Sequence, residues 1–318
     1  MKQNMWKLTL CAACVCAGGL IARGAPLQRS DVIADPAWLL HLDCDGLRTT
    51  AIGQYVLSEM DKPEATAKLA AFQAIFDFDL RSQLHGLTLY GGSGVPEDAV
   101  LLVYADFDAG RLTTLAKAAG KYQSSAHGQH VIHSWIDENK QGKNGAKPRV
   151  YAAIQGKRVI FGQREDRVGQ ALDVLDGVAA SMGNGSAFPD LGAPGNGHFI
   201  EAAARKMDLP DSDPHAAILK LSQSVELVVS EGQQQVQGAL TLMADSTPVA
   251  AQVYSIAQGL VALMKLQNDK PESVAIANAL TITQDGPRVT GNLALPASQA
   301  VEIMKAGAAR KAAAHAAK

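Results

Sequence analysis

The stretch RVYAAIQGKRVIFG, residues 149–162, gives the clearest indication of the fold. Two apolar runs flank Gln155-Gly156-Lys157, and this arrangement predicts two antiparallel strands joined by a tight hairpin turn. The residues from Asp166 to Leu175 then have the spacing of a helix with one apolar face. Strand, strand and helix in this order are typical of an α+β fold built on an antiparallel sheet.

A similar unit recurs near the C-terminus. The ranges 279–283 and 288–295 are predicted to pair across a turn, and a last helix begins near Pro296. Local sequence repeats too, because Val103-Tyr104-Ala105-Asp106 and Leu242-Met243-Ala244-Asp245 each end a strand before a helix. We therefore expect an α+β protein with two similar halves, each a mostly antiparallel sheet with helices packed on one face. Coincidence within an unduplicated α+β chain is the alternative interpretation.

Residues 182–198 are rich in glycine and proline and predict a linker between the halves. The expected N-terminal α+β half is 25–181 and the C-terminal half is 199–307. The Ala/Lys-rich tail 308–318 is expected to be a frayed, solvated helix end.

The first 24 residues have the composition of a signal peptide. Lys2 and Lys7 precede an uncharged stretch from Leu8 to Ile21, and Ala22-Arg23-Gly24 places small residues before a cut at Ala25. Fourteen apolar residues are too few to cross a bilayer core, which needs roughly 20. The alternative is an uncleaved N-terminal anchor. A lipid anchor is not expected, because the three cysteines at 11, 14 and 16 lie early in the apolar run. We predict export to the periplasm or the extracellular space.

Charge and cysteine content exclude several classes of function. Without the first 24 residues, which carry Lys2, Lys7 and Arg23, the chain has 26 basic and 31 acidic residues, a net charge of about −5. A mildly acidic chain is not attracted to nucleic acid, which requires a clustered positive face. After cleavage only Cys44 remains, which excludes an intramolecular disulfide and a thiolate zinc site. Polar residues interrupt the apolar stretch 249–264, which favours a packed helix. No transmembrane segment is therefore expected after signal cleavage.

Three histidines are the leading candidates for a metal site. His127, His130 and His133 recur at three-residue spacing, which on a helix would place them on one face. Their neighbours instead indicate a strand, where residues three apart point to opposite faces, so at most two can converge. Three Asp-x-Asp pairs, at 43/45, 77/79 and 106/108, are interpreted as helix caps and turn residues, with calcium binding as the alternative. No motif indicates a catalytic residue or a cofactor, and an enzyme is not favoured.

Four runs of sequence resemble a group of uncharacterised exported bacterial proteins: AWLLHLD (37–43), LRTT (47–50), HSWID (133–137) and LDVLDG (172–177). Those proteins combine a signal peptide with a duplicated α+β body of similar length. The resemblance covers most of the chain after residue 24. It implies compartment and architecture, and it brings no activity or catalytic residue with it.

These observations favour an exported, non-enzymatic binding or interaction protein that uses a sheet surface or the cleft between the halves. Its partner would be a protein or a small molecule. An exported hydrolase or metal-dependent enzyme is one alternative, and a self-associating structural component of the envelope is another. The oligomeric state stays open at this stage.

Overall fold

The structure is a computed structural model that describes residues 25–316 except 139, 141–144, 146, 184–187, 194, 196, 207–221 and 268–269. The predicted signal peptide therefore lies outside the described residues. The strands are β1 (Trp38–Asp43), β2 (Leu84–Gly91), β3 (Ala99–Ala105), β4 (Gln123–His127), β5 (His130–Ile136), β6 (Arg149–Gln155), β7 (Arg158–Gly162), β8 (His198–Arg205), β9 (Ser222–Gly232), β10 (Gln235–Ala244), β11 (Leu280–Asp285) and β12 (Arg288–Pro296). The helices are α1 (Cys44–Arg48), α2 (Ala51–Met60), α3 (Pro63–Phe76), α4 (Ala109–Ala118), α5 (Glu165–Leu175), α7 (Thr247–Lys265), α8 (Pro271–Ala279) and α9 (Ala297–Ala316), with short 3-10 turns at Arg29–Asp31 and Pro96–Asp98.

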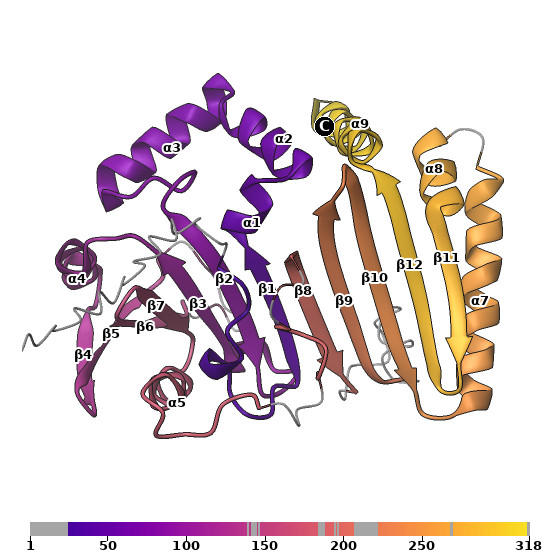
Figure 1. Ribbon diagram of the computed structural model, residues 1–318. Helices are drawn as coiled ribbons and strands as arrows, with labels where there is room; N and C mark the ends of the chain where they lie inside the picture. Colours follow the sequence, from indigo (N-terminus) through magenta and orange to yellow (C-terminus); the bar gives the residue numbers. More distant parts are fainter. Residues whose placement is uncertain are drawn as a thin grey trace, which may run out of the picture.

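All of these strands belong to one antiparallel sheet, in the order β11-β12-β10-β9-β8-β1-β2-β3-β7-β6-β5-β4 (Figure 1). The predicted α+β class with antiparallel pairing is confirmed. The halves do not have separate sheets, however, because β1 pairs with β8 along its length, from Trp38 opposite Ala204 to Leu42 opposite Ile200. The pairing satisfies backbone groups on both strands that would otherwise lie at exposed sheet edges.

The strand order outward from the β1–β8 pair corresponds for the first five strands on each side. One side runs β1-β2-β3-β7-β6 and the other runs β8-β9-β10-β12-β11, and only the first continues, with β5 and β4. In each half a helix follows the third strand, and another helix follows the last strand of the hairpin. An origin by duplication stays a prediction, and this matching order supports it.

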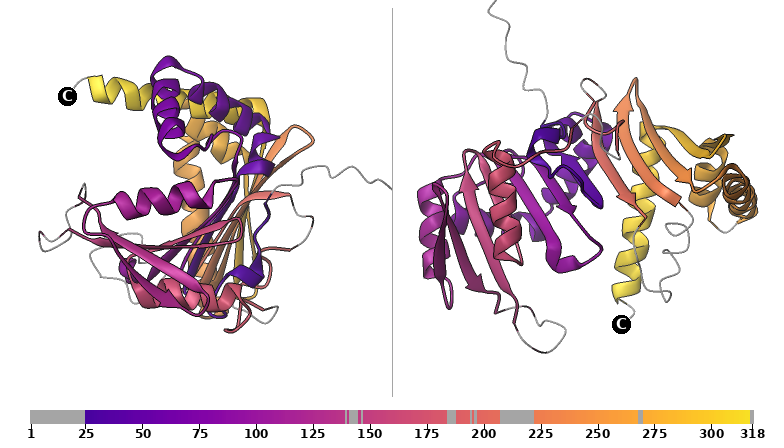
Figure 2. Two further views of the ribbon diagram at one scale, coloured as in Figure 1. Left: turned by 90° about the vertical axis from the view of Figure 1, so that its left-hand side faces the viewer. Right: turned by 90° about the horizontal axis from the view of Figure 1, so that it is seen from below.

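Helices cover both faces of the sheet in the N-terminal half, where the sequence suggested one. Ile160 of β7 packs with Val168 and Leu172 of α5, whereas the neighbouring Val159 and Phe161 face α4. Side chains alternate along a strand, so α4 and α5 lie on opposite faces. Figure 2 shows the two helices on either side of strands β4 to β7.

The main core lies on the α5 face, and two irregular segments complete it. Leu27 and Val32 come from the segment 25–33, and Phe188 and Leu191 come from the predicted linker 182–198. Arg29 ties the two segments together, because its guanidinium donates to the carbonyl oxygens of Phe188 at 2.8 Å and Leu191 at 2.6 Å. The described part of the linker is thus packed against the core, because its apolar residues Phe188 and Leu191 join the same buried cluster as the apolar face of α5.

Two C-terminal helices differ from expectation. Only one side of α7 is packed, where Ala250, Val249 and Val253 contact the smaller core around Leu242. By length and composition α7 alone, among the described helices, is long and apolar enough to cross a membrane, which is weak evidence for a span. The predicted tail 308–318 continues α9 as helix to Ala316, and α9 packs against α2 of the other half (Figure 1).

Candidate functional site

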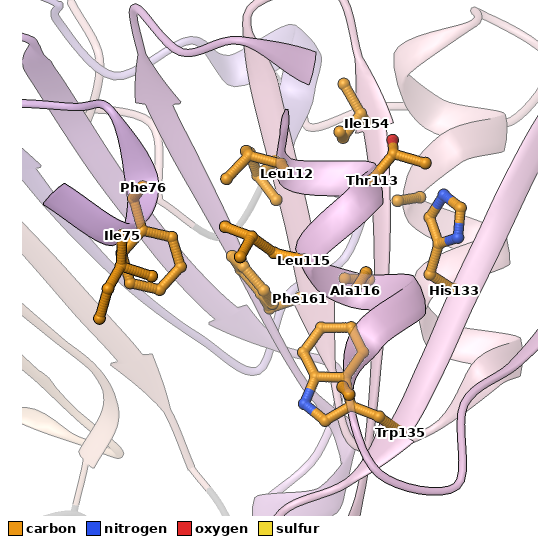
Figure 3. Close-up of a pocket in the computed structure, with 14 residues that line it drawn as sticks. Ile75, Phe76, Leu112, Thr113, Leu115, Ala116, His133, Trp135, Ile154 and Phe161 are labelled. Atoms are coloured by element: carbon orange, nitrogen blue, oxygen red, sulfur yellow. The ribbon is translucent and has the colours of Figure 1, made fainter. Parts of the chain in front are cut away.

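A cavity of about 330 Å³ lies between α4 and the sheet. Its floor is formed by β5, β6 and β7, its roof by α4, and one end by Ile75 and Phe76 at the end of α3 (Figure 3). The other end is bounded by His133 of β5. The cavity is partly open to solvent, and its lining is almost entirely apolar.

The sequence positions α4 through a cap and an amphipathic pattern. Asp108 caps the helix, because its carboxylate accepts a hydrogen bond from the backbone amide of Arg111 at 2.6 Å. Leu112, Leu115 and Ala116 then face the sheet at helical spacing. None of the ten residues of α4 is fully buried. The apolar face of α4 therefore rests over the sheet without packing closely against it.

The floor follows from strand alternation. Trp135 of β5, Ile154 of β6 and Phe161 of β7 point to the α4 face and are only half-buried. Their neighbours in sequence, such as Ile132 and Ile160, point to the α5 face and are fully buried. The large side chains on the α4 face keep exposed apolar surface because the space above them is not filled by protein.

His133 marks the boundary between the apolar cavity and a more polar hollow. The hydroxyl of Tyr122 lies 2.9 Å from its Nδ1, and the two rings stack with centroids 5.9 Å apart. Burial, with a smaller contribution from the charge of Lys117, lowers the pKa of His133 below its usual value. The ring is therefore neutral at pH 7. The adjoining hollow is lined by Lys117, Tyr122, Ser124, Gln129, His130 and His133 among others.

The three sequence-predicted histidines do not converge. His127 pairs with Asp173 of α5, Nε2 to carboxylate 2.8 Å, and His130 pairs with Asp176, 2.7 Å. His133 points to the opposite face of the sheet, as the strand spacing predicted. The ranges that the structure describes contain no group of three or more His, Cys, Asp or Glu side chains that could hold a metal ion. His127 and His130 instead join the β4–β5 hairpin to α5.

Several other sequence candidates have structural roles. Asp43 and Asp108 cap α1 and α4, and Asp79 accepts a hydrogen bond from the amide of Arg81 at 2.9 Å. Of the 43/45 pair, Asp43 is the cap and Asp45 lies within the first turn of α1, which begins at Cys44. Burial raises the pKa of the Cys44 thiol to about 11, so the thiol is protonated at neutral pH. A protonated thiol is a poor nucleophile.

Comparison with known proteins adds three distant structural neighbours. Crystal forms III, I and IV of a protein named TP0453 share 11%, 10% and 10% of their sequence with this chain, at TM-scores of 0.45, 0.45 and 0.44. The alignments cover 90%, 89% and 89% of this chain and 99%, 98% and 97% of the other chain. No protein-family model and no curated protein matches the chain.

Two of the histidines predicted as metal ligands lie at this site: His133 lines the cavity and the hollow, and His130 lines the hollow. The apolar lining of the cavity could not be predicted from the sequence, because Leu112, Trp135 and Phe161 have the same pattern as ordinary core residues. Two signals were available. Trp135 and His133 are two residues apart in a predicted strand and therefore lie on the same face. The helix α4 is rich in alanine, whose small side chain fills little of the space above a sheet.

Proposed function

We propose that the chain is an exported protein that binds a small amphiphilic molecule in the cavity under α4. The apolar body of the ligand occupies the cavity, and its polar head lies in the hollow beside His133 and Lys117. The observation that carries the proposal is an amphipathic helix held over an apolar sheet face with about 330 Å³ of space beneath it.

The volume of the cavity makes a ligand energetically favourable. Protein interiors are close-packed and contain few voids larger than a water molecule. An engineered apolar cavity of about 150 Å³ stays dry and binds benzene, and the space under α4 is about twice as large. Natural ligand sites begin at about 300 Å³ and are mostly apolar with a few polar groups. An apolar body would bury the half-exposed surfaces of Trp135, Phe161 and Leu115.

The polar end of the site favours a head group that accepts hydrogen bonds and carries negative charge. Lys117 projects from the exposed side of α4 near the hollow, and its charge acts on His133. Tyr122 and Ser124 add hydroxyl groups at the same place. The apolar cavity and the hollow share Thr113, His133 and Ile154, so one molecule can span both.

The same geometry supports binding over catalysis. His133 is the one titratable side chain that lines the apolar cavity, and its Nδ1 is engaged by Tyr122. A general base needs an orienting partner and a reacting group within hydrogen-bond reach. Among the described residues, the cavity lining offers no second acid or base that would complete such a pair.

Two fluorescent probes test the proposal. Phenylnaphthylamine is apolar, and anilinonaphthalene sulfonate is the same molecule with an anionic head. We expect both to bind the mature protein and to gain fluorescence, with the sulfonate bound more tightly. Lys117→Gln should weaken binding of the sulfonate and leave the neutral probe unchanged. Binding of neither probe would refute the proposal.

A matched pair of variants on α4 locates the site. Ala116 lines the cavity, whereas Ala118, two residues later, is exposed. Ala116→Leu should abolish binding of both probes because the added carbons occupy the cavity, and Ala118→Leu should leave binding unchanged. Equal loss in both variants would indicate that the probes bind elsewhere or to a loosened fold.

Self-association is a second candidate function, and α7 carries the observation in its favour. Ile256, Leu260 and Leu263 recur at helical spacing and are 60%, 55% and 60% exposed, on the side of α7 that faces away from the sheet. Contact between two copies of this stripe would bury apolar surface without burying charge. Sedimentation velocity should then show a dimer that Leu260→Glu dissociates and Gln258→Glu does not. A monomer at all concentrations would exclude this function.

A further inference from the structure

Two buried polar side chains of β1, His41 and Asp43, bind the first residue of the predicted mature chain, Ala25, and together form the Ala25 socket. The backbone nitrogen of Ala25 donates to Oδ1 of Asp43 at 2.8 Å, and the carbonyl oxygen of Ala25 accepts from Nε2 of His41 at 2.9 Å. Gly86 of β2 makes room for this contact, because a Cβ there would lie 3.3 Å from the Cβ of Ala25. Both polar groups of Ala25 are therefore held by side chains of β1.

The hydrogen bonds fix the protonation of His41. A carbonyl oxygen only accepts, so Nε2 carries the proton, and Nδ1 accepts from the hydroxyl of Thr88 at 2.8 Å. Burial lowers the pKa of His41 to about 4. The imidazole is therefore neutral at pH 7 and supplies no charge to its neighbours.

Asp43 is a buried carboxylate without a cationic side chain beside it. It is only 6% exposed, and it accepts hydrogen bonds from backbone amides, including those of Ala25 at 2.8 Å and Gly46 at 2.9 Å. The ion pairs found in the described part of the chain include none to Asp43. Nearby charge is unfavourable, because Asp45 and Glu201 are also acidic and couple to Asp43. Burial accordingly raises the pKa of the Asp43 carboxyl.

A buried carboxylate is costly unless an opposite charge compensates it. Cleavage before Ala25 would convert the amide nitrogen that already contacts Asp43 into an α-ammonium group. Peptide-bond hydrolysis supplies the charge: water adds across the bond, the carbonyl side leaves as a carboxylate, and the new amine takes up a proton at neutral pH.

We propose that removal of the first 24 residues completes the Ala25 socket, so that the new α-ammonium of Ala25 forms a buried ion pair with Asp43 and fastens the segment 25–33 over the sheet. This rests on the proposed export and on cleavage before Ala25. The rest of the segment is already tied to the fold. The Asp31 carboxylate accepts from Tyr104 at 3.0 Å and pairs with Arg158 at 2.9 Å, and Val32 is fully buried.

The test compares three N-termini on the mature chain: free Ala25, N-acetylated Ala25, and one extra glycine before Ala25. The glycine keeps the charge but moves it by about 3.8 Å, the spacing of adjacent residues. The pKa of the α-amino group, ordinarily about 7.7 to 8.0, is measured by NMR titration. We expect it to rise by at least about one unit for free Ala25 and to stay ordinary in the glycine-extended chain and in Asp43→Asn.

Thermal unfolding supplies a second readout. At pH 7 the chain with a free Ala25 amino group should have an unfolding temperature at least about 3 °C above that of the acetylated chain. About 1 kcal/mol, the size of an ion-pair effect, produces such a shift in a chain of this length. The difference should vanish below the pKa of Asp43, where the carboxyl is protonated, and above the raised pKa of the ammonium. An ordinary α-amino pKa together with equal unfolding temperatures would overturn the proposal, even if Asp43→Asn fails to fold.

N-terminal sequencing of protein from the envelope separates this proposal from export itself. A chain that begins at Ala25 supports both. A periplasmic chain that begins elsewhere overturns the ion pair and leaves export intact, and an uncleaved cytoplasmic chain overturns both.

Discussion

Filling the cavity under α4 should raise stability and abolish ligand binding together. Ala116→Leu adds three carbons to a side chain that lines the cavity. Each buried carbon stabilises by about 0.8 kcal/mol, so the gain in the free energy of unfolding is at most about 2.4 kcal/mol. An engineered Leu→Ala change opens a cavity of about 150 Å³, so the reverse change fits within about 330 Å³.

Urea unfolding followed by circular dichroism measures this gain. Ala118→Leu is the control, because the same side chain on the exposed side of α4 should change stability by less than about 0.5 kcal/mol. Destabilisation of Ala116→Leu by about 1–3 kcal/mol would show that there is no unfilled space under α4, since that is the cost of forcing carbons into a space already packed. Increased stability with unchanged probe binding would show that the cavity exists but is not the ligand site.

Three further predictions follow from other parts of the molecule. Burial lowers the pKa of His41 in the folded protein to about 4. As the pH falls, His41 therefore takes up a proton at a higher pH in the unfolded chain than in the folded protein. The free energy of unfolding should therefore drop by about 3 kcal/mol between pH 6.5 and pH 4, and urea titrations of His41→Gln should lack this component; identical pH profiles would contradict it. Gly259→Ala in α7 should stabilise by up to about 1 kcal/mol, since a Cβ there meets nothing within 4 Å. Gly169→Ala in α5 should instead destabilise, because its Cβ would lie 2.9 Å from the His127 ring; equal effects in thermal melts would refute the described packing. Native mass spectrometry of protein from the envelope should reveal a small adduct that survives chelator, whereas an adduct removed by chelator would favour a metal site.

Most local structure could be read from the sequence, because it depends on short-range chemistry. The turn at Gln155-Gly156-Lys157 forms with Gly156 at a φ of 60°, which glycine adopts without strain. Asp108 caps α4, as predicted, and Pro63 occupies the first position of α3, where its missing amide hydrogen costs nothing. These features depend on residues only a few positions apart, so tertiary contacts did not need to be known.

Strand β8 was not predicted from the sequence. Its sequence alternates, but Glu201 occupies a core-facing position, which obscured the pattern that marks a half-buried strand. Glu201 is tolerated there because it accepts a hydrogen bond from the amide of Gly192 at 2.6 Å, a contact with the segment predicted to be a free linker. That contact depends on how the chain returns across the sheet. The missed strand is the one that joins the two halves.

The α+β class, the antiparallel hairpins and the opposite orientation of His130 and His133 follow from the residue pattern, because strand and helix periodicity act locally. Long-range packing instead joins both halves in one sheet, brings Ala25 to Asp43, and leaves space between α4 and the side chains of Trp135 and Phe161. Each of these depends on contacts between distant segments. A cavity in particular is a space that packing leaves unfilled, and no residue pattern encodes the distance between a helix and the sheet beneath it.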